Sequence, residues 1–265
     1  TCALPIYFYL GRCGAATAKI EIEDVVLDHT VYTYNGSAKT PGVTVKAAGG
    51  AVLSKGTDYT LSYEKGRINA GAYKVTVKGK GKYTGTFTTV FIISPASLGK
   101  LTLSKSKLAY NGKARVPSIT VKGSQGSASL TRNKDYTVAY STKHKAVGVH
   151  GITVTGTGNY TGTLSAQFSI VPAKAVVKSV TAGKQRFTVK LGGKASAYGG
   201  TTFNIAYKVK GAKSWQYVSA KGKSKVVKKL KKGKKYQVRV QVKKKVAGVW
   251  YAGAWSATKT TKKVK

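Results

Sequence analysis

The sequence predicts an all-β protein built from three tandem β-sandwiches in an extended rod. Three observations indicate this fold class. Apolar and polar residues alternate along short segments, Gly, Asn and Pro separate those segments at short intervals, and one long block of sequence occurs twice in succession. Alternation with period two is typical of strands that bury one face, and closely spaced turn signals favour sandwiches. No segment shows a convincing helical period.

The duplicated block defines the first two expected domains, repeat 1 over residues 19–96 and repeat 2 over residues 97–173. The matched segments are Tyr34-Asn35-Gly36 with Tyr110-Asn111-Gly112, Pro41 with Pro117, Asp58-Tyr59-Thr60 with Asp135-Tyr136-Thr137, and 81–86 with 158–163. A motif that serves two copies of one building block is first a requirement of the fold. We therefore expect these residues to form turns and strand entries before any site.

The strands of the repeats follow from alternation, and their turns follow from glycine. The expected strands contain 43–45, 73–77, 87–93, 119–121, 152–154 and 168–170. Asn-Gly accepts positive φ, which predicts a hairpin or tight turn after Tyr34 and Tyr110. The Gly-x-Gly segments 79–81 and 156–158 predict another turn or bulge. Pro95 and Pro172 make the junctions short and stiff, which favours a rod.

Residues 174–265 form a third expected domain that does not continue the repeat. Alternating strands are expected at 187–191, 203–207 and 236–242. The order Leu230, Gly233, Tyr236 before an alternating strand resembles fibronectin type III domains, and Tyr236 would be their tyrosine corner. The early core Trp of that family is missing. Leu191 stands near its place, and we expect Trp215 or Trp250 to fill the volume.

The motifs shared by the repeats resemble immunoglobulin-like modules found in tandem on surface and secreted proteins of Gram-positive, clostridial-type bacteria. The carrying residues are the Tyr-Asn-Gly turn, Pro41 or Pro117, the Asp-Tyr-Thr step and the Gly-x-Gly-x-Tyr-Thr-Gly-Thr entry. The resemblance implies an extracellular protein at the cell surface or in the wall. It also implies a spacer, an adhesive stalk, or an appendage of an enzyme.

Residues 1–18 are excluded from these arguments as an artefact or the remnant of a leader. Residues 1–6 resemble the translation of a sequencing adapter, and the chain contains no Met, so we expect a fragment that lacks upstream domains. Both cysteines, Cys2 and Cys13, fall in this segment. Disulfide and thiolate chemistry are therefore not expected in the three domains.

The charge balance predicts a polyanionic partner. The chain has 47 Lys and Arg against 7 Asp and Glu, for a net charge of +40, and residues 174–265 hold 26 basic residues and no acid. Lys greatly outnumbers Arg, which favours diffuse attraction over geometric readout. The candidate polyanion-binding residues are Lys228, Lys229, Lys231, Lys232, Lys234, Lys235, Lys243, Lys244 and Lys245. The alternative interpretation is a solvated face that blocks aggregation.

Aromatic residues near the C-terminus offer a second candidate site. Trp250, Tyr251 and Trp255 would stack on sugar rings if they were exposed, whereas packing in the core is the favoured alternative.

Catalytic and metal-binding patterns are not apparent. Asp58 and Asp135 are predicted to cap turns, with an isopeptide bond beside either acid as the weaker alternative. His29, His144 and His150 lack partner carboxylates or cysteines, and we expect them at the surface. No cofactor or metal is predicted, and no apolar run is long enough to span a membrane.

These observations together predict a non-enzymatic extracellular stalk or adhesive module associated with anionic cell-wall polymers or glycans. The alternative is a carbohydrate-binding accessory region of a secreted hydrolase, whose other domains lie upstream. Nucleic acid is expected to bind only non-specifically, because aromatic stacking platforms and arginine readout are not visible.

Overall fold

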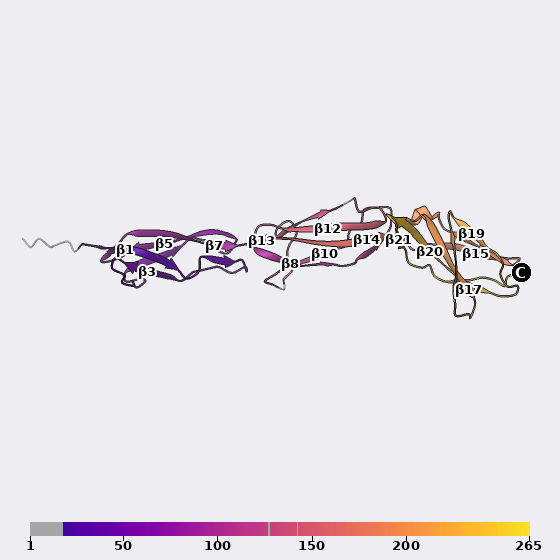
Figure 1. Ribbon diagram of the computed structural model, residues 1–265, viewed down its shortest axis with the longest axis horizontal. Coiled ribbons are helices and arrows are strands. Elements are labelled where there is room, and N and C mark those ends of the chain that lie inside the picture. The colour runs from indigo at the N-terminus through magenta and orange to yellow at the C-terminus, as the bar shows by residue number, and fades with distance from the viewer. Residues whose placement is uncertain (1–17, 127, 142) are drawn as a thin grey trace, which may run out of the picture. The chain divides into compact units, whose positions relative to one another are not determined.

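The computed structural model describes residues 18–126, 128–141 and 143–265. The expected leader therefore lies, except for its last residue, outside the described part of the chain. Two compact units are present, a first that ends at Ala96 and a second over Ser97–Lys265. Among the described residues every regular element is a strand except one short 3-10 helix, which confirms the all-β prediction (Figure 1). None of these residues forms a helix that could cross a membrane.

The first unit is a sandwich of two sheets. Its strands are β1 (Ile20–Leu27), β2 (Val31–Thr33), β3 (Val43–Ala47), β4 (Tyr59–Tyr63), β5 (Gly71–Gly79), β6 (Tyr83–Thr84) and β7 (Thr86–Ser94). One sheet has the order β3-β1-β6 and the other β2-β7-β5-β4. Alternate residues such as Val45, Val77 and Phe91 are fully buried. The predicted period of two therefore sets which side chains face the core.

The second unit begins with a sandwich of the same topology. Its strands are β8 (Ala96–Leu103), β9 (Lys107–Ala109), β10 (Ile119–Gly123), β11 (Tyr136–Tyr140), β12 (Gly148–Gly156), β13 (Tyr160–Thr161) and β14 (Thr163–Val171). The orders β10-β8-β13 and β11-β12-β14-β9 match those of the first unit strand for strand. Both copies share a parallel pair, β2 with β7 in the first and β9 with β14 in the second. The duplicated sequence thus encodes a duplicated fold.

The shared motifs form turns. Asn35 Oδ1 accepts a hydrogen bond from the Ser37 amide at 3.0 Å, and Asn111 repeats this bond to Lys113. The following glycines have φ of 81° and 78°, so each Asn-Gly is a tight turn rather than a hairpin between paired strands. Asp58 accepts the Ser54 amide and Asp135 the Thr131 amide, each at 2.8 Å, which confirms the prediction of turn-capping acids.

Pro41 also has a defined contact in the first sandwich. Its carbonyl accepts a hydrogen bond from the Tyr63 hydroxyl at 2.6 Å. Burial raises the pKa of the Tyr63 phenol, so the hydroxyl remains a donor at neutral pH.

The third sandwich completes the second unit. Its elements are β15 (Val177–Gly183), β16 (Arg186–Leu191), η1 (Ala195–Tyr198), β17 (Thr202–Val209), β18 (Gln216–Ala220), β19 (Ser224–Val227), β20 (Tyr236–Val246), β21 (Val249–Ala252) and β22 (Lys259–Thr260). The sheets are β15-β16-β19 and β18-β17-β20-β21, with β22 beside β20. Phe187, Leu191 and Phe203 fill the core. The expectation that Trp215 or Trp250 fills it is wrong, because neither belongs to the buried cluster.

Tyr236 forms the expected tyrosine corner. Its hydroxyl accepts a hydrogen bond from the Lys231 amide at 2.9 Å, which fixes the loop before β20. We expect Tyr236→Phe to lower the free energy of unfolding of the third sandwich by ~1–3 kcal/mol, because the Lys231 amide then has no hydrogen-bond acceptor. Tyr207→Phe is the matched control, since within the described residues the Tyr207 hydroxyl has no hydrogen bond. Equal losses for the two variants in urea titrations would contradict this role.

Candidate functional site

The loop between β19 and β20 carries six of the nine predicted lysines, and all six are exposed. Positive φ at Lys229 (59°) and Gly233 (75°) turns this loop back on itself. The Gly233 amide donates to the Val264 carbonyl, and the Val264 amide donates to Lys234, so the C-terminal segment is held against the loop. Val264 itself is buried, which anchors the segment and leaves its lysines in water.

Further lysines gather at this end of the sandwich. The Gln185 amide donates to the Lys265 carbonyl at 2.7 Å, which places the β15–β16 turn beside the C-terminal residues. We call the resulting exposed group the terminal lysine cluster. Its members are Lys184, Lys228, Lys229, Lys231, Lys232, Lys234, Lys235, Lys262, Lys263 and Lys265. Sequence reasoning missed four of them, because backbone hydrogen bonds between distant segments bring them together.

The other three predicted lysines lie elsewhere. Lys243, Lys244 and Lys245 are near the opposite end of β20, and a strand rises ~3.3 Å per residue, so Lys244 is roughly 30 Å from Lys235. The Lys243 ammonium lies 5.3 Å from the centre of a Trp250 ring. Lys244 instead lines a pocket between the two sandwiches of the second unit. The nine lysines therefore do not form one site.

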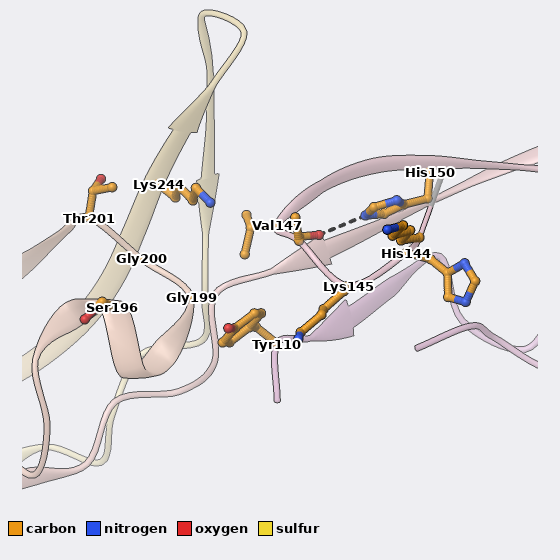
Figure 2. A pocket seen from close by; sticks show the side chains of 12 residues that line it. Tyr110, His144, Lys145, Val147, His150, Ser196, Gly199, Gly200, Thr201 and Lys244 are labelled. Atoms are coloured by element: carbon orange, nitrogen blue, oxygen red, sulfur yellow. Dashed lines mark hydrogen bonds between the residues drawn. The ribbon is translucent and has the colours of Figure 1, made fainter. Parts of the chain in front are cut away.

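That pocket has a volume of about 510 Å³. Tyr110, Lys145 and His150 line it from the second repeat, and Gly199 and Lys244 line it from the third sandwich (Figure 2). Gly199 and Tyr110 are in close contact, since a Cβ on Gly199 would lie 2.5 Å from Tyr110 Cγ. The Tyr-Asn-Gly turn of repeat 2 is therefore also a packing surface for the third sandwich.

The histidines differ in their exposure. His150 is only 6% exposed, stacks on Phe168 at 5.4 Å and has Nε2 at 2.9 Å from the Ala146 carbonyl, so the expectation that it is a surface residue is wrong. His29 is exposed beside Asp28. Across the described ranges no group of three His, Cys, Asp or Glu could hold a metal ion.

The outward face of sheet β18-β17-β20-β21 carries an aromatic cluster. Cζ of Arg239, on β20, lies over the rings of both Trp215 and Trp255, at 4.4 and 4.7 Å from their centres. The Tyr217 ring lies 6.2 Å from Trp255 and is 60% exposed. Sequence reasoning missed Trp215, Tyr217 and Arg239, because only the register of three strands unites them.

The three residues predicted to stack on glycans lie in different environments. Trp250 is 52% exposed, which contradicts core packing, and Trp255 belongs to the outer aromatic cluster. Tyr251 instead packs against the buried cluster of repeat 2. Only the two tryptophans therefore remain candidates for ligand contact.

No protein-family model matches the chain, and neither does any curated protein. Among solved structures, one titled "Myokine structure" is 16% identical, with 36% of this chain and 99% of that chain covered at a TM-score of 0.29. Titin domains A168–A170 are 16% identical over 89% and 97% of the two chains, with a TM-score of 0.28. The chicken CNTN1 FN1–FN3 domains are 13% identical over 93% and 100%, with a TM-score of 0.32. The sandwich architecture itself rests on the sheets and cores described above.

Proposed function

We propose that this chain is a non-enzymatic spacer of a bacterial cell-surface protein, held against anionic wall polymers by its third sandwich. The observation that carries the proposal is the terminal lysine cluster, in which ten exposed lysines meet within a domain that has no acidic residue. No internal carboxylate of residues 174–265 neutralises these charges. A polymer with closely spaced phosphates or carboxylates supplies the missing counter-charge.

The physics of such binding needs no shaped pocket. A polyanion condenses counterions, and each lysine that neutralises one of its charges releases ions to the solvent. Lysine suits this role because its ammonium is a hydrated point charge on a flexible stem. Affinity then depends on the number of lysines and falls steeply with salt. Nucleic acid would bind by the same non-specific route.

The spacer role is supported by the two sandwiches of identical topology. Their shared Asn and Asp side chains accept backbone hydrogen bonds within turns. The second repeat is also packed on the third sandwich, with the Ala173 amide donating to the Tyr198 carbonyl at 2.8 Å. A short junction with a backbone hydrogen bond restricts the relative orientation of two domains more than a flexible linker does. The motif resemblance supports the bacterial surface as the location.

A charge-neutralising variant tests the anchor. We expect Lys231, Lys232, Lys234 and Lys235 changed to Gln together to weaken retention on isolated cell walls at least about tenfold at low salt. The matched control neutralises Lys100, Lys105, Lys107 and Lys113, which are also exposed but lie in repeat 2. An equal loss in both variants would refute the cluster as the anchor, because net charge alone would then determine binding.

A carbohydrate-binding accessory region of a secreted hydrolase is the second candidate function. Exposed Trp250 and Tyr217 on one sheet face favour it, because flat aromatic faces stack on sugar rings. Under this alternative neutral glycans are retained at about 500 mM salt, where charge attraction is screened. Trp250→Ala would abolish that retention.

A further inference from the structure

Arg239 occupies an unusual environment on the outward face of the third sandwich. Its guanidinium carbon Cζ lies over two indole rings, 4.4 Å from the centre of the Trp215 ring and 4.7 Å from that of Trp255. Its strand neighbour is Ala206, which follows inward-facing Ile205 and therefore points outward, yet is 0% exposed. The small Ala206 side chain leaves room for an aromatic layer above the sheet, and Tyr217 lies opposite it on β18.

The Arg239 guanidinium has no counter-ion among the residues that the structure describes. Arg239 Nε is buried without a hydrogen-bond partner, and within the described residues the side chain forms no hydrogen bond or ion pair. An enclosed arginine is normally paired with an acid, because leaving its donors unsatisfied is costly. Residues 174–265 contain no acid that could serve. With two indole rings against the guanidinium and Nε enclosed, the two Nη atoms are the donors left for an external anion.

The chemistry of the two Nη atoms indicates the class of ligand. Two parallel N–H groups match the two oxygens of a carboxylate. Exposed Tyr217 and Trp250 provide flat apolar surfaces beside it, and sugar rings stack on such surfaces. Lys208 at 4.9 Å from a Trp215 ring and Lys243 add positive charge to the same face. A polyol phosphate chain lacks the sugar rings whose C–H faces the aromatic residues would contact.

We propose that this face, the arginine clamp of Arg239, Trp215 and Trp255 with flanking Tyr217 and Trp250, binds an acidic polysaccharide through the carboxylate of a uronate. Lys243, which lies under Trp250, follows Arg239 by four residues on β20, or roughly 13 Å. A ligand that contacts both ends is therefore an oligosaccharide. This proposal rests on the anionic partner of the proposed function and gives it a discrete, geometric site.

Binding of tetragalacturonate to the full chain tests the clamp. The titration is followed by tryptophan fluorescence at about 300 mM salt, which screens the terminal lysine cluster. We expect Arg239→Lys, which keeps the charge but loses the planar fork, to weaken binding at least about tenfold. Tyr217→Ala, a change at an exposed position, should weaken it about fivefold. Neutral tetragalactose and a glycerol phosphate oligomer should each bind at least about tenfold more weakly than tetragalacturonate.

The control is the variant with Lys231, Lys232, Lys234 and Lys235 changed to Gln, which should bind tetragalacturonate within about twofold of the wild type. Wild-type affinity in folded Arg239→Lys would overturn the clamp, as would equal affinity for the neutral or phosphate probe. If Arg239→Lys does not fold, unchanged affinity in Tyr217→Ala overturns it. Wall retention that is indifferent to the cluster variant, with tetragalacturonate binding intact, would instead count against the proposed anchor alone.

Discussion

Phe187→Ala is expected to lower the free energy of unfolding of the third sandwich by ~3–5 kcal/mol. The Phe187 side chain is fully buried, and its ring contacts those of Tyr207 and Tyr236 at 5.6 and 6.0 Å. Removing it leaves a cavity between the two sheets that rigid strands cannot close. The measurement is unfolding in urea, monitored by hydrogen exchange, because exchange rates report on each sandwich separately.

The first unit provides the internal control for this variant. Its core around Val75 and Phe91 belongs to a separate compact unit, so its exchange protection should not change. A loss below about 1 kcal/mol in the third sandwich would contradict the role of Phe187 in its core. An equal loss in the first unit would contradict the assignment of independent cores.

Gly199→Ala is expected to open the packing between repeat 2 and the third sandwich. Gly199 has φ of 76°, which costs an Ala ~1–2 kcal/mol, and the new methyl would overlap the Tyr110 ring, which adds ~1–3 kcal/mol. The exposed junction should then become sensitive to protease near Ala173. Cleavage is measured by mass spectrometry under native conditions, and we expect its rate to rise about tenfold or more.

Gly211→Ala is the matched control for this junction. Gly211 also has positive φ, at 91°, but a Cβ there would meet nothing within 4 Å. This variant should be destabilised by the positive φ of an Ala, but cleavage at the junction should not become faster. Faster cleavage in both variants would show that general destabilisation, and not contact with Tyr110, controls the junction.

The strands and turns were the features that the sequence could predict. Strict alternation identified the buried sides of β5 and β20, and the doubled Asp-Tyr-Thr motif identified Asp58 and Asp135 as turn caps. Local chemistry determines these features, so a single sequence contains the necessary information. The burial of His150 could also have been predicted, because alternation along β12 places it on the same inward face as Ile152 and Val154.

Features made by distant segments could not be predicted in this way. The arginine clamp requires the registers of β17 with β18 and β20, and neither follows from alternation alone. The lysine count predicted a polyanion partner, but it could not reveal that most of β20 separates Lys235, just before its start, from Lys244, near its end. Likewise, Tyr110 was expected only as part of a turn, while its contact with Gly199 depends on how two sandwiches meet.

The most direct test of the central claim is the salt dependence of binding to a defined polyanion. The logarithm of the association constant for poly(glycerol phosphate) is measured against the logarithm of salt concentration, for the wild type and for the variant with Lys231, Lys232, Lys234 and Lys235 changed to Gln. If the terminal lysine cluster is the anchor, the slope should be shallower in the variant by about 3, because each lysine contributes ~0.7–0.9. Identical slopes would contradict the account, since these lysines would then release no counterions on binding.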